Sequence, residues 1–408
     1  MKTVWIVNHY AHHHERDGRS TRHEHFAAGL APDWHTVVIA AGTDHPTGRS
    51  HLHGVTLRRR WFGDGYQFCW LRGVDHRGSG RRRAVRRVAD ILLFSMLLLL
   101  PGVLRGLPRP DVIVGSSFHP LAAIAASALA RRRGVPFVFE PRDLWPESAI
   151  GLAGMHEHHP AIRLLRRIER VTVRRAVHLI SPLEGVGRYY EDRVPFTWVP
   201  NGVAPDTEPL PPRHPDADFS VTYIGSMGPA NALETVLDGF DLAHRRAAAA
   251  GGPRLALVLV GDGADASRLR ERASGLQSAR SIIWTGRVPQ AEARRIGRQA
   301  GCLVVTMHAL PIYQHGVSMN KQYEYMLLGR PLLVGAPVPI APVNESRCGV
   351  QVAADSPAAL ATGMLAMATS DPAVLDAMGA RGREHVLREY DYRLLAERYG
   401  RALSEALR

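Results

Sequence analysis

The 408-residue sequence predicts an α/β protein of two domains, each built on a parallel, Rossmann-like sheet. A single hydrophobic core rarely serves more than about 300 residues, so this length favours two domains. The composition, with 45% hydrophobic and 22% charged residues, is that of a globular protein. Short apolar runs alternate with helical stretches along the chain, which is the rhythm of βαβ units.

The predicted strands fall into two series. The first comprises Val4–Val7, Thr36–Ala40, Asp111–Gly115, Pro136–Glu140 and Val177–Ile180. The second comprises Ser220–Gly225, Leu255–Val260, Ile282–Thr285, Leu303–Thr306 and Pro331–Val334. A cluster of prolines between the two series excludes regular helix or central strand there.

We therefore predict a first domain over residues 1–204, a proline-rich linker over 205–217 and a second domain over 218–385. We expect residues 386–408 to form a helix that packs back towards the first domain. In open α/β sheets, ligands bind beyond the carboxyl ends of the strands. Two such domains facing each other would form a binding cleft.

The net charge of +13 could attract nucleic acid, anionic lipid or a phosphorylated ligand. The densest basic segment, residues 77–87, precedes the apolar run Ile91–Leu100. This run of ten residues is too short to span a bilayer of about 30 Å. Residues 77–104 form either a helix on an anionic membrane surface or a buried helix with solvated arginines. The arginines show no aromatic interleaving, so we expect no nucleic-acid partner.

Cysteine usage and the N-terminus favour the cytoplasm. Cys69, Cys302 and Cys348 form no C-x-x-C pair, so we expect neither a disulfide framework nor a zinc knuckle. The first residues resemble a strand rather than a signal peptide. The protein is expected in the cytoplasm, and on the inner face of the membrane if the basic segment binds lipid.

The histidine run and the absence of a P-loop motif argue against two kinds of site, a metal site and an ATPase site. His12, His13 and His14 are consecutive and cannot share a helix or strand face, so we expect a solvated loop and no metal site. No G-x-x-x-x-G-K-[ST] motif occurs, which excludes a P-loop ATPase at the motif level.

Glycine-bearing turns follow the first strand of each domain. Gly18 lies in the first turn with Arg22 close behind, and Gly225 and Ser226 begin the second. Glycine allows backbone amides to approach a ligand, and a helix N-terminus favours anions. Such turns are common in α/β proteins, so an ordinary structural turn remains an alternative.

The most informative stretch is Gly316–Met326, a polar loop leading into a short helix that Gly329 can end. Lys321 and Glu324 are three residues apart and share a helix face. The lysine could neutralise a diphosphate, and the carboxylate could accept two ribose hydroxyls. An ordinary exposed ion pair is the alternative.

This stretch, S-M-N-K-Q-Y-E-Y-M-L-L-G-R-P, resembles the signature of glycosyltransferase family 4, in the branch of amino-sugar transferases from bacterial O-antigen and capsule clusters. Further matches occur in the family's order along nearly the whole chain: T-R-H at 21–23, G-S-S-F-H at 115–119, F-E-P-R-D-L-W-P-E-S at 139–148 and V-P-N-G-V at 199–203. The resemblance implies the GT-B fold, with the acceptor in the first domain and the nucleotide in the second. It also implies retention of the donor's anomeric configuration and no bound metal or other cofactor.

The resemblance implies a role for each matching residue. Glu324 would hold the ribose, Lys321 the pyrophosphate, and Arg287 and Val288 the base. Gly18 would let the first loop close over the phosphates, with Arg22 adding positive charge, and His119 would touch the donor sugar near the reacting carbon. The catalytic set would then be His119, Lys321 and Glu324, with His23, Glu140, Arg142 and Asp143 in the acceptor cleft. His119 as a plain loop histidine, and Arg142 and Asp143 as a mutual ion pair, remain alternatives.

Two departures from the family pattern affect the donor site. Gly316 replaces a frequent Glu eight residues before Glu324, and Gly225–Asn231 lacks the usual basic pair. We expect Lys321 to carry more of the phosphate charge. The amides of Val317 and Ser318, with Asn320 beside them, would replace the missing Glu.

The sequence thus predicts a metal-independent hexosyltransferase that uses a UDP-linked sugar, an N-acetylhexosamine or its deoxy form. The acceptor would be a hydroxyl of a glycan, a lipid-linked saccharide or a natural product. A sugar-nucleotide epimerase of the same architecture is the enzymatic alternative. The other is a basic membrane-surface or nucleic-acid binder without catalysis.

Overall fold

The computed structural model describes the chain except residues 19, 20, 32, 45, 46, 79, 118, 207, 210 and 212–217, and the side chains of 152 and 153. Most of the predicted linker therefore lies outside the described residues. The chain divides into two compact units. Unit 1 contains Met1–Asn201, His315–Ser318 and Tyr392–Arg408, and unit 2 contains Gly202–Gln314 and Met319–Asp391.

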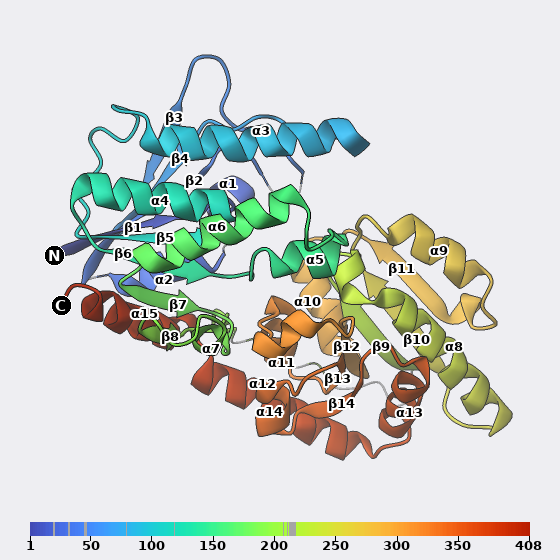
Figure 1. Cartoon of the computed structure of the whole chain (residues 1–408). Coiled ribbons are helices and arrows are strands. Elements are labelled where there is room, and N and C mark those ends of the chain that lie inside the picture. The colour runs from blue at the N-terminus through green and yellow to red at the C-terminus, as the bar shows by residue number, and fades with distance from the viewer. Residues whose placement is uncertain are drawn as a thin grey trace. The chain divides into compact units, whose positions relative to one another are not determined.

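Unit 1 is built on an eight-stranded sheet of order β3-β4-β2-β1-β5-β6-β7-β8 (Figure 1). Its strands are β1 (Lys2–Val7), β2 (Trp34–Ala41), β3 (Arg58–Phe62), β4 (Tyr66–Leu71), β5 (Val112–Ser117), β6 (Phe137–Pro141), β7 (His178–Ser181) and β8 (Phe196–Trp198). Its helices are α1 (His14–Asp17), α2 (Arg22–Leu30), α3 (Gly80–Leu99), α4 (Pro120–Arg133), α5 (Glu147–Ala153), α6 (Pro160–Arg175), α7 (Val186–Tyr189) and α15 (Tyr392–Glu405). Every strand pair is parallel except β3 with β4.

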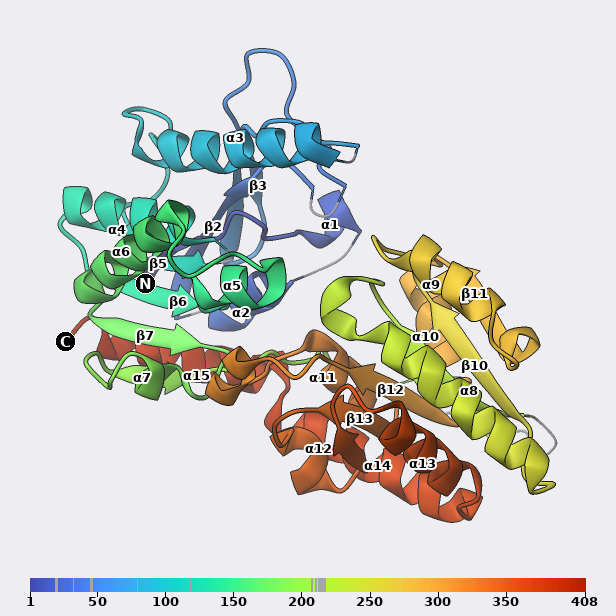
Figure 2. The same cartoon turned by 45° about the vertical axis from the view of Figure 1, so that its right-hand side comes forward.

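The sheet of unit 1 is covered on both faces, as a parallel sheet requires. Helices α3, α4 and α6 lie over one face, while α2 and α15 lie over the other (Figures 1 and 2). The α2–α15 face buries a core of strand and helix side chains that includes Val4, Ile6, Phe26, Leu395 and Tyr399. The last helix of the chain therefore belongs to the core of the unit that contains the first strand.

Unit 2 has a six-stranded, fully parallel sheet of order β11-β10-β9-β12-β13-β14. Its strands are β9 (Phe219–Ile224), β10 (Leu255–Val260), β11 (Ile282–Gly286), β12 (Cys302–Thr306), β13 (Leu332–Ala336) and β14 (Gly349–Ala353). Its helices are α8 (Leu233–Ala249), α9 (Ala266–Ser274), α10 (Gln290–Gln299), α11 (Asn320–Leu327), α12 (Ala341–Ser346), α13 (Pro357–Ala368) and α14 (Pro372–Glu389). Helices α8, α9 and α13 share one core with the strands.

All ten predicted strands occur in the structure, with ends that agree to within two residues. Four further strands, β3, β4, β8 and β14, were not predicted. Residues 386–408 do not form one helix, because α14 ends at Glu389 and α15 begins at Tyr392. Cys69, Cys302 and Cys348 are all buried.

The two sides of helix α3, which contains most of the basic segment, lie in different environments. Asp90, Phe94, Leu97 and Leu98 point into unit 1 and are buried. On the other side, Val88 is 56%, Leu92 48% and Met96 65% exposed. The helix is thus both a core element and the carrier of an exposed apolar stripe. Among the described residues, no single helix is long and apolar enough to cross a membrane, although the pair α13 and α14, bent by 111°, passes by length and composition alone.

Candidate functional site

In unit 2, glycine ends three neighbouring strands at the carboxyl edge of the sheet. Gly225 follows β9, Gly261 follows β10 and Gly286 ends β11, and all three have positive φ. A Cβ on Gly261 would lie 2.0 Å from the carbonyl oxygen of Gly225. The backbones therefore pack closely here, which leaves main-chain groups at the edge where open α/β sheets bind ligands.

Lys321 lies directly against this edge. A Cβ on Gly225 would come within 2.4 Å of Lys321 Cε, so the lysine occupies the space that the glycine leaves. Its ammonium donates to Asn231 Oδ1 and lies 5.0 Å from the centre of the Tyr223 ring. Burial lowers the pKa of Lys321 to about 8, against the opposing charge of Glu324. A partly buried ammonium with one neutral oxygen partner is suited to bind an anion.

Glu324 follows Lys321 by one turn of α11 and is exposed to solvent. Desolvation by the surrounding protein raises its pKa, opposed by the charges of Arg294 and Lys321. Because water reaches the side chain, hydration limits this rise, and we treat the carboxylate as ionised at neutral pH. No ion pair joins Glu324 to Lys321 in the described part of the chain. The carboxylate is thus available to hydroxyl donors.

Tyr325 fixes α11 to β9 and so positions both residues. Its hydroxyl donates to the carbonyl of Ile224 at 2.7 Å and accepts from the amide of Ile224 at 2.6 Å. The side chain is buried. Tyr325 belongs to the signature stretch, but its role in fixing α11 was not predicted from the sequence.

The other predicted donor residues lie at two places. Arg287 is exposed and follows Gly286, with Val288 next to it, and Ser226 accepts from Asn231 through its carbonyl. Asn320 begins α11. Gly316, Val317 and Ser318 instead belong to unit 1.

The structure gives a physical reason for Gly316. Its φ is +111°, and a Cβ would lie 2.8 Å from the amide nitrogen of Glu184. A glutamate at this position would be strained and would clash with the backbone. Ser318 accepts from Asn201 through both its hydroxyl and its carbonyl, so that loop is held within unit 1.

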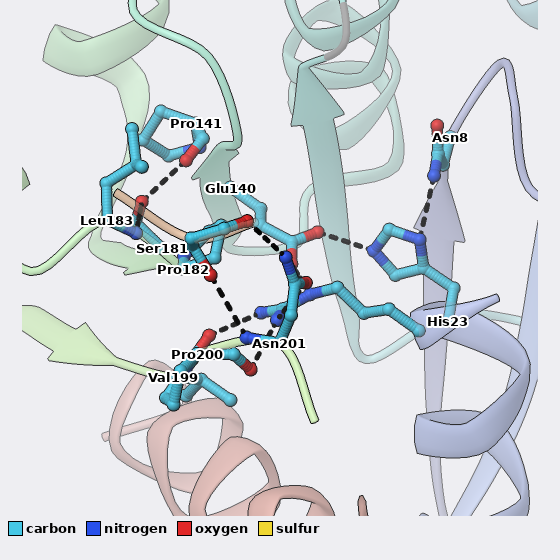
Figure 3. Close-up of polar contacts among 12 residues, drawn as sticks. Asn8, His23, Glu140, Pro141, Ser181, Pro182, Leu183, Val199, Pro200 and Asn201 are labelled. Atoms are coloured by element: carbon cyan, nitrogen blue, oxygen red, sulfur yellow. Dashed lines mark hydrogen bonds and ion pairs between the residues drawn. The ribbon is translucent and has the colours of Figure 1, made fainter. Parts of the chain in front are cut away.

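In unit 1, a buried polar network joins the end of β6 to α2 and to the loop after β8 (Figure 3). Glu140 accepts from Arg22 Nε at 2.9 Å and from His23 Nε2 at 2.6 Å. The other guanidinium nitrogens of Arg22 donate to the carbonyls of Val199 and Pro200 and to Asn201. All of these groups lie in unit 1.

The tautomer of His23 follows from its neighbours. Asn8 Oδ1 accepts from the amide of Tyr10, so Asn8 Nδ2 faces His23 and donates to Nδ1. His23 is therefore neutral and donates to Glu140 through Nε2, in agreement with burial, which lowers its pKa. Burial alone would raise the pKa of Glu140, but His23, Arg22 and Arg142 hold it far below its ordinary value. Glu140 is the charged member of the pair.

This network changes the part assigned to Arg22. The side chain is buried, and each of its guanidinium nitrogens already donates to an acceptor within unit 1. Contact with a donor phosphate would require these bonds to break, so we assign Arg22 to holding Glu140 and the 199–201 loop. Gly18 ends α1 with φ of +68°. Arg142 and Asp143 form no ion pair with each other in the described chain, and burial raises the pKa of Asp143.

His119 is a helix cap with a free donor. Its Nδ1 accepts from the amide of Ala122, the first turn of α4, so the proton resides on Nε2. That Nε2–H is buried and has no hydrogen-bond partner among the described residues. Burial, helped by His9 and Arg87, lowers the pKa of His119 well below its ordinary value. The neutral imidazole can donate to a ligand oxygen, but it has no free lone pair to act as a base.

His9 stands beside His119, with ring centres 4.9 Å apart. Its Nε2 donates to Asp90 of α3 at 2.9 Å, and Asp90 also accepts from Thr43 and from the amide of Val74. His9 and Asp90 are 81 residues apart, so no local sequence pattern predicts that they meet.

In unit 1, a surface hollow lined by Lys2, Trp34 and Arg401 lies at the amino-terminal edge of the sheet, away from His119 and Glu140. Because open α/β sheets bind ligands at the opposite edge, the hollow is not part of the candidate site.

The histidine run is not a solvated loop as predicted, since His12 and His13 are buried. Its neighbours from β3 and β4 cover it, and those strands were not predicted.

Comparisons with known proteins match both units. Residues 17–202 match the model of the glycosyl transferase 4-like domain, and residues 218–370 match that of glycosyl transferases group 1. No curated protein matches the chain significantly.

Solved structures show the same fold at low sequence identity. Sucrose-phosphate synthase from Thermosynechococcus elongatus is 15% identical, with a TM-score of 0.70 over 99% of each chain. The structure described as trehalose-6-phosphate from E. coli bound with UDP-2-fluoro glucose is 11% identical, with a TM-score of 0.73 over 100% of this chain and 99% of the other. Anabaena HepE in complex with UDP-glucose is 12% identical, with a TM-score of 0.65 over 99% of this chain and 100% of the other.

The predicted fold class is thereby confirmed: two units with parallel sheets match structures of two-domain GT-B glycosyltransferases. The first domain model matches most of unit 1 and the second most of unit 2, and together they match more than half of the chain. The chain belongs to the glycosyltransferases of GT-B architecture.

Proposed function

We propose that the protein transfers a sugar from a UDP-linked donor to an acceptor hydroxyl, with retention of configuration. The observation that carries this proposal is Lys321, held against Gly225 at the carboxyl edge of the unit 2 sheet, with Glu324 exposed one turn later. The E. coli and Anabaena structures contain a UDP-sugar, which supports the choice of nucleotide.

In this proposal the diphosphate binds Lys321 and the amides after Gly225. The ammonium has one neutral oxygen partner and is partly desolvated, so an anion gains more from it than from a hydrated lysine. Glu324 accepts the ribose hydroxyls, and the backbone at Arg287 and Val288 meets the base. No bound metal is needed, because Lys321 supplies the positive charge.

The donor sugar meets His119 through its free Nε2–H. This role fits a neutral, buried imidazole whose other nitrogen caps α4. His23 and Glu140 maintain the geometry of the acceptor site. Arg142 and Asp143 are further residues of that site.

The chemistry then depends on the leaving group. The bond from the anomeric carbon to the diphosphate oxygen breaks, and the acceptor oxygen bonds to the same face of that carbon. The acceptor proton passes to the departing β-phosphate oxygen. Lys321 stabilises the charge that develops on the diphosphate, which is electrostatic catalysis by a preorganised group.

The test is turnover of UDP-sugars by Glu324→Gln, which removes the charge and keeps the shape. We expect loss of transfer and of thermal protection by UDP, with an unchanged fold. Glu292→Gln is the matched control, since Glu292 is a partly exposed residue of unit 2 in an ion pair with Arg295. Native turnover by Glu324→Gln would contradict the ribose assignment. A new sugar nucleotide formed without acceptor would identify an epimerase instead.

For the donor sugar we propose an N-acetylhexosamine or its deoxy form, on the resemblance to amino-sugar transferases of O-antigen and capsule clusters. The acceptor is a hydroxyl of a glycan, a lipid-linked saccharide or a natural product. Thermal protection by a panel of nucleotide sugars tests the donor, because a ligand that binds only the folded state raises its stability. Protection by UDP-glucose alone would contradict an amino-sugar donor.

We also propose that α3 binds the cytoplasmic face of an anionic membrane. Its exposed stripe of Val88, Leu92 and Met96 follows exposed arginines, Arg82 and Arg86, which is the pattern of an interfacial helix. The double variant Leu92→Glu, Met96→Glu should lose sedimentation with phosphatidylglycerol vesicles and keep its melting temperature. Leu97→Glu serves as contrast, since that residue is buried and should destabilise unit 1. Unchanged vesicle binding by the double variant would refute the surface role.

A further inference from the structure

The histidine run and α2 bring three metal-ligating side chains together in unit 1. Ligand atoms of His13, His14 and Glu24 all lie within 4.8 Å of one another. His13 is the N-cap of α1, His14 is the first residue of that helix, and Glu24 lies in the first turn of α2. Consecutive histidines converge here because the chain turns into α1 between them.

His13 is enclosed by aromatic side chains. Its ring centre lies 4.1 Å from that of Trp61, 4.9 Å from Phe68 and 5.9 Å from Trp70. The residue is fully buried, and neither ring nitrogen has a hydrogen-bond partner among the described residues. A buried imidazole without a partner is costly, so this position calls for an explanation.

Glu24 is a buried carboxylate whose only basic partners among the described residues are histidines. It accepts from the backbone amide of His14 at 3.1 Å and contacts His14 Nδ1 closely. The Tyr66 hydroxyl lies 3.5 Å from Glu24 Oε1, the oxygen that His14 Nδ1 contacts. No lysine or arginine reaches it in the described part of the chain, so the two imidazoles are its only basic neighbours there and a bound cation would balance its charge.

The spacing of one pair of candidate ligand atoms, from His13 and Glu24, is that of two ligands on a tetrahedral cation. His13 Nε2 and Glu24 Oε1 are 3.4 Å apart. Two ligands at Zn–N and Zn–O lengths near 2.0 to 2.1 Å, at a tetrahedral angle, are separated by about 3.3 Å. The contact is too long for a good hydrogen bond, but it has the separation of two ligands of one ion.

We propose that His13, His14 and Glu24 bind a zinc ion, with the fourth coordination position open. Two imidazoles and one carboxylate are a ligand set that zinc takes in proteins. The ion would fill the unmet bonding of His13, balance Glu24, and tie the start of α1 to α2 after β1. This inference is independent of the proposed nucleotide-binding residues Lys321 and Glu324, which lie in unit 2.

The experiment measures zinc content and stability of the full-length protein, purified with a tag that contains no histidine. After chelation and dialysis against zinc, we expect one zinc per chain and a rise in melting temperature. Cobalt should give the visible absorption of a tetrahedral site. His14→Ala, whose side chain is half exposed and thus tolerant, should weaken zinc binding more than about 100-fold, beyond the usual effect of an outer-shell change.

His12→Ala is the matched control, because it shortens the same histidine run but leaves the three proposed ligands. It should retain one zinc per chain, while Glu24→Gln should lose it. Circular dichroism verifies that each variant is folded. Absence of zinc in the native protein, or equal loss in His12→Ala and His14→Ala, would overturn the proposal.

Discussion

At the scale of single residues, the protonation of Lys321 controls how strongly the proposed site attracts a diphosphate. Its pKa in the free protein is about 8, so the ammonium loses its proton as the pH rises through that value. We expect the Kd for UDP to be constant below the pKa and to rise above it, approaching about tenfold per pH unit. Titration calorimetry of UDP binding across this range measures the effect.

Lys321→Arg supplies the control, because a guanidinium stays charged throughout this range. Its Kd for UDP should not vary with pH in the way that the native protein's does. A native Kd that is flat across the pKa of Lys321 would show that the lysine does not bind the diphosphate.

Glu140 is the residue on which the buried network of unit 1 depends. Glu140→Gln leaves the Arg22 guanidinium buried without its carboxylate, which typically costs about 3 to 5 kcal/mol. Because the folded pKa of Glu140 lies below its unfolded value, its stabilisation is present above the unfolded value of 4.5 and is lost as the pH falls further.

Urea unfolding of the native protein and Glu140→Gln tests this expectation. The two midpoints should differ widely at neutral pH and converge in acid. Glu157→Gln, an exposed glutamate of the same unit, should match the native protein at both pH values. A midpoint of Glu140→Gln equal to the native one at neutral pH would mean that the network contributes no stability.

At the scale of elements, one hydroxyl links α11 to β9. Tyr325→Phe leaves the amide and carbonyl of Ile224 without their partner, and an unsatisfied buried group costs about 1 to 3 kcal/mol. We expect lower stability of unit 2 and weaker UDP binding, since α11 carries Lys321 and Glu324. Thermal unfolding and calorimetry measure the two effects.

Tyr399→Phe is the matched control for the loss of a hydroxyl. The Tyr399 hydroxyl is buried and has no hydrogen-bond partner among the described residues, so its removal should not destabilise the protein. If both variants behaved alike, the bond to Ile224 would have no special weight.

At the scale of the whole molecule, sequence patterns located what is local and missed what is distant. The ten predicted strands are short apolar runs, and Lys321 with Glu324 form a pattern within one helix turn. Glu140 and Arg22 meet across 118 residues, and Tyr325 meets Ile224 across 101. Such pairs depend on how strands are ordered, which periodicity does not specify.

The histidine run illustrates the same limit. Its burial depends on Trp61, Phe68 and Trp70 of β3 and β4. Strand β3 is the antiparallel edge of the sheet, and its sequence Arg58–Phe62 begins with three arginines, so it lacks the apolar run of the predicted strands. A loop expected in solvent is therefore enclosed.

The last helix of the chain, α15, packs in one core with the first strand and α2, so unit 1 depends on both ends of the chain. Leu395, Tyr399 and Leu403 of α15 are fully buried in the same core as Val4 and Phe26. Unit 1 is thus completed only by the last residues of the chain, whereas unit 2 contains none of them. Deletion of residues 392–408 should expose the α2 face of the unit 1 sheet and destabilise that unit alone.

Calorimetric unfolding of the truncated and native proteins tests this, with UDP as a probe of unit 2. The truncated protein should lose one transition and keep the transition that UDP raises. Leu395→Ala should have a graded form of the same effect, about 2 to 5 kcal/mol for a buried leucine. Glu397→Ala, on the exposed face of α15, should change nothing. Loss of both transitions on truncation would show that unit 2 cannot fold without unit 1, and that the two compact units are a single cooperative structure.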